Sequence, residues 1–126
     1  MINITVLMST YNGEKYLKEQ LDSIFAQKNV DVKLVVRDDA SSDRTVDILK
    51  EYQKIHENMI IINDRKNLGA CCSFLYLIRT YTQGKYFALA DQDDIWDEDK
   101  LVTAVKVIET VEKKKSNIPL LYYSNL

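Results

Sequence analysis

Three carboxylates lie close together in the last third of the chain. Asp91, Asp93 and Asp94 follow the apolar run of residues 86–90. Such a run followed at once by acidic residues predicts a buried strand with carboxylates at its C-terminal end. Acids this close repel one another unless they are solvated, protonated or neutralised by a cation, and hard oxygen ligands suit Mg²⁺ or Mn²⁺. The spacing favours a divalent metal site, and a solvated acidic loop before the next helix is the alternative.

Polar residues follow three other apolar runs in the same way. They are Ser9 to Tyr11 after residues 4–8, Asp38 and Asp39 after residues 32–36, and Asp64 to Asn67 after residues 59–62. The carboxyl ends of parallel strands meet at one edge of a sheet, and ligands bind at that edge in open α/β folds. We therefore expect these polar groups to converge there, with unrelated polar loops as the alternative.

The elements that would position these residues alternate along the chain. Short apolar runs predict strands at 4–8, 32–36, 59–62, 86–90 and 120–123. Apolar residues at helical spacing predict helices at about 14–27, 46–56, 71–81 and 101–111. Asn12 is a candidate N-cap for the first helix. Alternating strands and helices predict an α/β fold, a Rossmann-like and mostly parallel sheet with helices on both faces.

Composition narrows the choice of function. The chain of 126 residues fits one domain, and its net charge of −2 argues against nucleic acid as a partner bound through global charge. No apolar run reaches the 18 residues of a transmembrane segment. The N-terminus lacks the pattern of a signal peptide, so we expect a cytoplasmic location, which includes the inner face of the membrane.

The cysteines and the single histidine offer little chemistry. Cys71 and Cys72 are adjacent and lack the ligand spacing of a zinc site, so we expect both to pack as small core residues. His56 lies at the end of a predicted helix, where we expect a surface or helix-end role.

Nucleotide binding would need an unusual mode. The three glycines, Gly13, Gly69 and Gly84, form neither G-x-G-x-x-G nor a P-loop, which disfavours an NAD enzyme or a P-loop ATPase. An aromatic ring to stack on the base, a carboxylate to accept from base or ribose, and a metal on the diphosphate would suffice instead. Tyr11 offers such a ring, although it could equally pack within its turn.

Four segments together carry a specific resemblance. In this order and with these gaps, they are STYNGEKYLKEQLDSI, VVRDDASSDRT, KNLGA and ALADQDDIWDEDKL. The series resembles the nucleotide-binding half of an inverting family 2 glycosyltransferase with a GT-A fold. The form DQDDIW resembles members that transfer deoxyhexoses such as rhamnose onto bacterial surface polysaccharides.

The resemblance assigns nucleotide contacts to the first three segments. Ser9, Thr10 and Tyr11 would line the base pocket. Asp39 would meet the base or ribose, with Asp38 beside it. Arg65, Lys66 and Asn67 lie where the family often has a further nucleotide contact. The resemblance does not decide which residue makes it, and we include Lys66 and Asn67 in the expected site.

The same resemblance identifies residues 91–93 as the D-x-D element. Asp93 would hold Mg²⁺ or Mn²⁺ on the diphosphate of a UDP- or dTDP-linked sugar. Asp91 would face the ribose or the metal, with Gln92 between them in the nucleotide-sugar site, and Asp94 would assist.

This chain differs from the family that it resembles at the general base. By the resemblance it is a carboxylate beyond Leu126, so residues 1–126 would form a single donor-binding domain that lacks the acceptor-binding half, and the uncovered sheet would favour self-association. A non-catalytic nucleotide-binding module is therefore an alternative. A haloacid dehalogenase-like phosphatase is another, because its nucleophile motif is also a strand ending in D-x-D.

Overall fold

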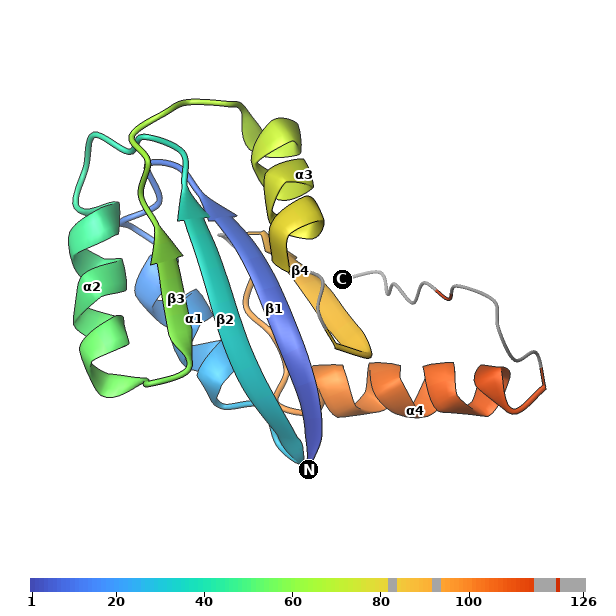
Figure 1. Ribbon diagram of the computed structural model, residues 1–126. Helices are drawn as coiled ribbons and strands as arrows, with labels where there is room; N and C mark the ends of the chain where they lie inside the picture. Colours follow the sequence, from blue (N-terminus) through green and yellow to red (C-terminus); the bar gives the residue numbers. More distant parts are fainter. Residues whose placement is uncertain (82–83, 92–93, 115–119, 121–126) are drawn as a thin grey trace.

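The computed structural model describes residues 1–81, 84–91, 94–114 and 120 (Figure 1). Within them, strands and helices alternate along the chain. The elements are β1 (Ile2–Thr10), α1 (Leu17–Phe25), β2 (Val30–Asp38), α2 (Thr45–Ile55), β3 (Met59–Ile62), α3 (Ala70–Tyr81), β4 (Tyr86–Asp91) and α4 (Lys100–Glu112).

The strands form one parallel sheet in the order β3-β2-β1-β4. Thr10 lies opposite Asp38 on β2, and Ser9 lies opposite Asp91 on β4. The predicted parallel sheet is therefore confirmed, and its register brings the polar ends of β1, β2 and β4 to one edge.

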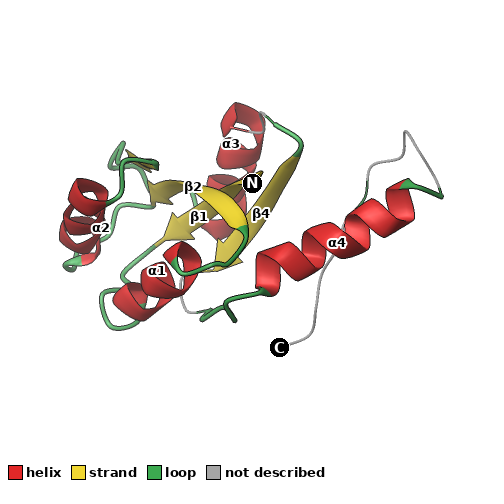
Figure 2. Ribbon diagram, turned by 90° about the horizontal axis from the view of Figure 1, so that it is seen from below, coloured by secondary structure: helices red, strands yellow, loops and turns green. Residues whose placement is uncertain are grey.

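Helices cover both faces of the sheet, as predicted. The main core joins one face to α1, α2 and α4, through side chains such as Val6, Leu21 and Leu101. A smaller core on the other face joins Leu7 and Val35 to Leu77 of α3. Figure 2 shows α1 and α3 on opposite sides of the sheet.

The α3 face of the sheet is open over β4. Ala90 is buried in the main core, whereas the alternate residues Phe87 and Leu89 remain 48% and 52% exposed. The reason is that α3 packs against β1 and β2 and not over the edge strand. The predicted self-association through this uncovered face stays a prediction.

Two local predictions are wrong. Asn12 does not cap α1, because its backbone is left-handed (φ 47°) and its side-chain oxygen accepts the Ser42 N–H at 2.8 Å. It links the β1–α1 and β2–α2 loops, and α1 begins only at Leu17. Cys71 and Cys72 are exposed and not in the core, because Ser73 and Leu77 occupy the buried side of α3.

The other local predictions have mixed outcomes. His56 ends α2, as predicted, and its ring stacks on Phe25 with 3.7 Å between the ring centroids. Of the predicted strand at 120–123 only Leu120 is described, and it lies outside any strand. No helix among the described residues has both the length and the apolar character needed to cross a membrane.

Candidate functional site

A cleft of about 370 Å³ lies at the carboxyl edge of the sheet. Its lining combines the ends of three strands with the start of α3: Ser9, Thr10, Tyr11, Asp39, Asn67, Gly69, Ala70, Phe74 and Asp91. Six of these residues come from the predicted site. A larger hollow of about 660 Å³ lies at the opposite edge, where the strands begin, and it gathers none of the strand ends.

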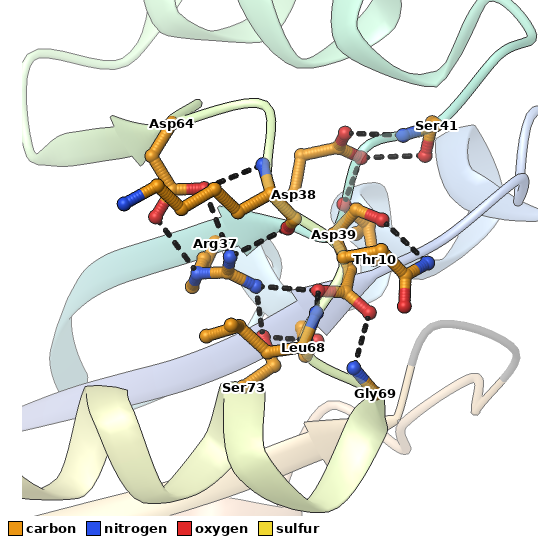
Figure 3. Close-up of polar contacts among 12 residues, drawn as sticks. Thr10, Arg37, Asp38, Asp39, Ser41, Asp64, Leu68, Gly69 and Ser73 are labelled. Atoms are coloured by element: carbon orange, nitrogen blue, oxygen red, sulfur yellow. Dashed lines mark hydrogen bonds and ion pairs between the residues drawn. The ribbon is translucent and has the colours of Figure 1, made fainter.

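The side chain of Arg37 lies beneath the cleft and is fully buried. Its Nε and Nη2 bond the Asp64 carboxylate at 3.4 and 2.8 Å, and Nη2 also donates to the Lys66 carbonyl at 2.8 Å. Its Nη1 donates to Asp39 at 2.7 Å and to the Ser73 hydroxyl at 3.0 Å (Figure 3). A guanidinium has five N–H donors, so every donor of this buried cation has an acceptor.

The Arg37 network joins three parts of the chain. The two carboxylates come from the end of β2 and the β3–α3 loop, the carbonyl comes from the same loop, and Ser73 lies in α3. Burial alone would lower the pKa of the Arg37 guanidinium, but the hydrogen bonds to Asp39 and Asp64 outweigh it and raise that pKa. The network fixes the β2 side of the cleft around a permanent charge.

Asp39 belongs both to the Arg37 network and to the lining of the cleft. Its Oδ1 accepts from Arg37 and from the Leu68 N–H, both at 2.7 Å, and its Oδ2 accepts from the Gly69 N–H at 3.0 Å. Burial would raise its pKa, but the Leu68, Arg37 and Gly69 hydrogen bonds lower it below the ordinary value. A carboxylate has about four acceptor positions. The described part of the chain uses three, which leaves one on Oδ2 beside the cleft.

Asp38 has a different position from its neighbour. Its Oδ1 accepts from the hydroxyls of Thr10 and Ser41 at 2.8 and 2.7 Å, and its Oδ2 accepts from the Ser41 N–H at 2.8 Å. Ala40, which lies between Asp38 and Ser41 in the sequence, adopts a left-handed backbone conformation with φ 64°. Asp38 is buried, does not line the cleft, and ties the end of β1 to the turn after β2.

The β3–α3 loop contributes mainly its backbone. The Lys66 N–H donates to Asp64 at 3.1 Å and its carbonyl accepts from Arg37, but its side chain does not line the cleft. Asn67 lines the cleft, and its side-chain amide donates to the Asp39 carbonyl at 3.2 Å. The structure thus brings Asn67, and not Lys66, to the predicted site.

Asp91 borders the cleft on the β4 side and is exposed. Gln92 and Asp93 lie outside the described residues. Within the described ranges, no group of three or more His, Cys, Asp or Glu side chains is placed to hold a metal ion. Mg²⁺ is commonly bound by one or two carboxylates together with substrate phosphates, so an exposed aspartate at the mouth of the cleft fits such a shared site.

Five contributors to the cleft were not predicted from the sequence. Gly69, Ala70 and Phe74 line it, and Arg37 and Ser73 support it from below. Arg37 could have been recognised, because it is a charged residue that directly follows an apolar strand pattern and precedes two aspartates. Ser73 gives no comparable signal, because a small polar residue is ordinary in a helix.

Comparison with known proteins identifies the family. The pattern described as Glycosyl transferase family 2 matches residues 5–114. The chain belongs to glycosyl transferase family 2. The match spans all the residues that line the cleft, so family membership and the cleft concern the same part of the chain. This family assignment therefore decides against the alternative of a haloacid dehalogenase-like phosphatase.

Individual relatives agree with this assignment. The chain is 38% identical over 122 residues to the dTDP-rhamnosyl transferase RfbG of Shigella flexneri, an alignment covering 92% of this chain and 42% of RfbG. The structure of S. aureus TarS 1-349 in complex with UDP has a TM-score of 0.75 and 27% identity, covering 86% of this chain and 32% of that one.

A second solved structure belongs to the mannosyltransferase PcManGT from Pyrobaculum calidifontis in complex with GDP-Man and Mn²⁺. It has a TM-score of 0.74 and 27% identity, covering 82% of this chain and 31% of PcManGT. The predicted GT-A fold is confirmed by these structures. The chain spans about two fifths of the RfbG length and about a third of the two solved chains.

Proposed function

We propose that this chain forms the donor and metal site of an inverting glycosyltransferase. The donor is a UDP- or dTDP-linked sugar, and the acceptor is a polysaccharide or a lipid-linked saccharide. The observation that carries the proposal is the cleft itself, where Ser9, Thr10, Tyr11 and Asp39 lie with Asp91 at one edge of a family 2 sheet.

The β2 side of the cleft would hold the nucleoside. Asp39 remains an acceptor-only carboxylate, and its remaining position on Oδ2 suits a donor such as the ring N–H of uracil or thymine. Tyr11 is 48% exposed at the cleft, and its ring would provide an aromatic surface for stacking of a base. The UDP complex of TarS and the dTDP named for RfbG support a pyrimidine nucleotide.

The β4 side would hold the diphosphate. We assign the metal to Asp91 and Asp93, with Gln92 beside the nucleotide sugar, and the Mn²⁺ in the PcManGT complex supports a divalent cation. When bound, Mg²⁺ or Mn²⁺ would neutralise charge that develops on the leaving diphosphate. The carboxylates of this chain would anchor that end of the donor next to the cleft.

Inverting transfer also requires a general base. The acceptor hydroxyl must lose a proton as its oxygen attacks the anomeric carbon and the bond to the diphosphate breaks. We assign no residue of this chain to that role, and a base beyond Leu126 stays a prediction. Sugar transfer to an acceptor by the 126-residue chain alone would contradict it.

Calorimetric titration of UDP and dTDP tests the donor site directly. We expect binding in Mn²⁺ or Mg²⁺ that weakens in EDTA, because the diphosphate then loses its cation. Asp93→Ala should lose the metal-dependent part of the affinity. The matched control is Asp31→Ala, which removes an exposed aspartate at the opposite edge of the sheet.

The outcomes separate the two parts of the proposal. Failure of the wild-type chain to bind either nucleotide under any condition would contradict the donor site. Equal binding in Mn²⁺ and EDTA would contradict the metal site and leave the nucleoside contacts in place.

A further inference from the structure

Three polar side chains lie along one side of α1: two within the helix, Gln20 and Ser23, and Gln27 just after its C-cap Ala26. Gln20, Ser23 and Gln27 are spaced by three and four residues, which places them in one stripe next to the apolar residues that face the sheet. We call these three residues the α1 polar stripe. Gln20 is fully buried and Gln27 is 8% exposed, so these amides are part of the interior. A buried polar side chain costs free energy unless it is hydrogen-bonded, so its partners indicate its role.

Besides two bonds to carbonyls of α1 itself, the stripe bonds main-chain groups of four residues that follow or end β4: Asp91, Trp96, Asp97 and Leu101. The Gln20 amide donates to the Asp91 carbonyl, and the Trp96 N–H donates to Ser23 Oγ at 3.1 Å. Gln27 acts at two points: its amide nitrogen donates to the Asp97 carbonyl at 2.6 Å, and its Oε1 accepts the Leu101 N–H at 3.0 Å.

The hydrogen bonds follow the same order along α1 and along the segment after β4. Gln20, Ser23 and Gln27 meet residues 91, 96 and 97 in that order, and the Lys28 N–H donates to the Glu98 carbonyl at 2.8 Å just beyond. The segment after β4 is therefore attached along the length of α1. Its described backbone gains hydrogen bonds from the helix that a sheet partner would otherwise provide.

Apolar packing holds the same segment but does not set its register. Trp96 and Leu101 are buried in the main core at 5% and 4% exposure. Hydrophobic contacts are non-directional, whereas hydrogen bonds to named carbonyl and amide groups fix which residue lies at which height along the helix. Together with the pairing of Asp91 and Ser9 in the sheet, the stripe thus fixes the Asp91 end of this segment at the edge of the cleft.

We infer that Gln20, Ser23 and Gln27 are positioning residues that place the Asp91 end of the acidic segment for a nucleotide diphosphate with its divalent cation. The inference rests on the proposed function of the cleft. The side chains that would touch the ligand are Asp91 and its neighbours, and the α1 polar stripe acts through the backbone behind them.

The test separates positioning from folding by comparing two ligands. Uridine and UDP are titrated calorimetrically into the wild-type chain and into Ser23→Ala, Gln27→Leu and Gln20→Met, each in Mn²⁺ and in EDTA. The ratio of UDP affinity in Mn²⁺ to that in EDTA should fall about tenfold, the scale of lost outer-shell support at a metal site. Uridine affinity should not change, because Asp39 and Tyr11 are untouched.

A second readout does not depend on any ligand. Hydrogen exchange of the Trp96 and Leu101 amides should accelerate in Ser23→Ala and Gln27→Leu, respectively, because each amide loses its acceptor. The matched control is Gln53→Leu, which removes an amide-to-carbonyl bond between α2 and Met59, away from the cleft. It should alter neither the affinity ratio nor these two exchange rates.

Ser23→Ala removes only one oxygen atom, so it keeps the test valid if Gln20→Met fails to fold. Folded stripe variants with the wild-type affinity ratio would overturn the inference and leave the donor site standing. A wild-type chain that binds neither uridine nor UDP would instead overturn the proposed function, and the inference with it.

Discussion

The two sides of the cleft present aspartates in opposite ways. On the β2 side, Asp39 is buried, paired with Arg37 and bonded by two backbone amides. On the β4 side, Asp91 is exposed, and α1 holds the segment through its main-chain carbonyl. On one side the carboxylate is paired with a cation and backbone amides before any ligand arrives, and on the other the carboxylate is exposed to solvent.

This difference suits the two parts of a nucleotide sugar. A nucleoside is neutral and is recognised by hydrogen bonds and ring contacts, which benefit from groups already fixed in place. The divalent cation on a diphosphate is commonly held by one or two carboxylates together with the phosphate oxygens, which an exposed aspartate can reach. We therefore expect mutations on the β2 side to affect folding and those on the β4 side to affect binding.

The largest expected effect comes from Arg37→Met. The substitution leaves the buried Asp39 without its cation and the Lys66 carbonyl without a donor, and breaking a buried ion pair costs about 3 to 5 kcal/mol. Urea unfolding measures the loss. Arg79→Met, at an exposed arginine of α3, is the control and should change stability little. A loss below about 1 kcal/mol would mean that the network is not structural.

Asp91→Asn should show the reverse behaviour. The exposed side chain contributes little to folding, so stability should stay within about 0.5 kcal/mol of wild type. UDP affinity in Mn²⁺ should fall by about tenfold or more, because the metal loses a charged ligand. Calorimetry and urea unfolding on the same preparation give both values. Lost stability with retained affinity would reverse the comparison between the two sides.

Acid should weaken the β2 side selectively. Burial would raise the pKa values of Asp39 and Asp64, but hydrogen bonds from backbone amides and Arg37 hold both below the ordinary 3.8. Their stabilising contribution is therefore present above pH 3.8 and is lost as pH falls through the folded-state pKa values. Asp43, whose pKa is also lowered, adds to this trend.

Urea unfolding between pH 6 and pH 2 measures this dependence. The decline should begin near pH 4 and should be shallower in Arg37→Met, since that variant has already lost the pairing that lowers the Asp39 pKa. Identical pH profiles for the two proteins would show that Arg37 does not hold the carboxyls ionised.

The smallest effect is expected from Ala40→Gly. Ala40 has φ 64°, a left-handed conformation that costs a residue with a Cβ roughly 1 to 2 kcal/mol. Glycine removes that strain, but its greater freedom in the unfolded chain lowers stability by about 0.5 to 1 kcal/mol. A net gain in stability of about 0.5 kcal/mol is therefore expected. Thermal unfolding with Ala26→Gly as a destabilising reference would check the sign, and a loss of stability in Ala40→Gly would contradict it.

The sequence predicted the sheet and the edge that carries the site, but not the side-chain network beneath it. Strand and helix patterns depend on local periodicity, so every element between β1 and α4 was anticipated to within a few residues. Arg37 bonds Asp64 and Ser73, residues 27 and 36 positions away, and no local pattern encodes such contacts. Asn12 was misread for the same reason, because its partner Ser42 lies 30 residues further along.

The register of the central strand also suggests an order of assembly. Val6 pairs with Leu34 on β2 and with Ala88 on β4. The second pairing closes a loop about three times as long, which costs roughly 1 kcal/mol more in chain entropy. We expect β1, β2 and the Arg37 network to form first, and β4 to join a template already built. The acidic edge of the cleft would then be the last part of the site to form, after α1 has folded and can bond the segment that follows β4.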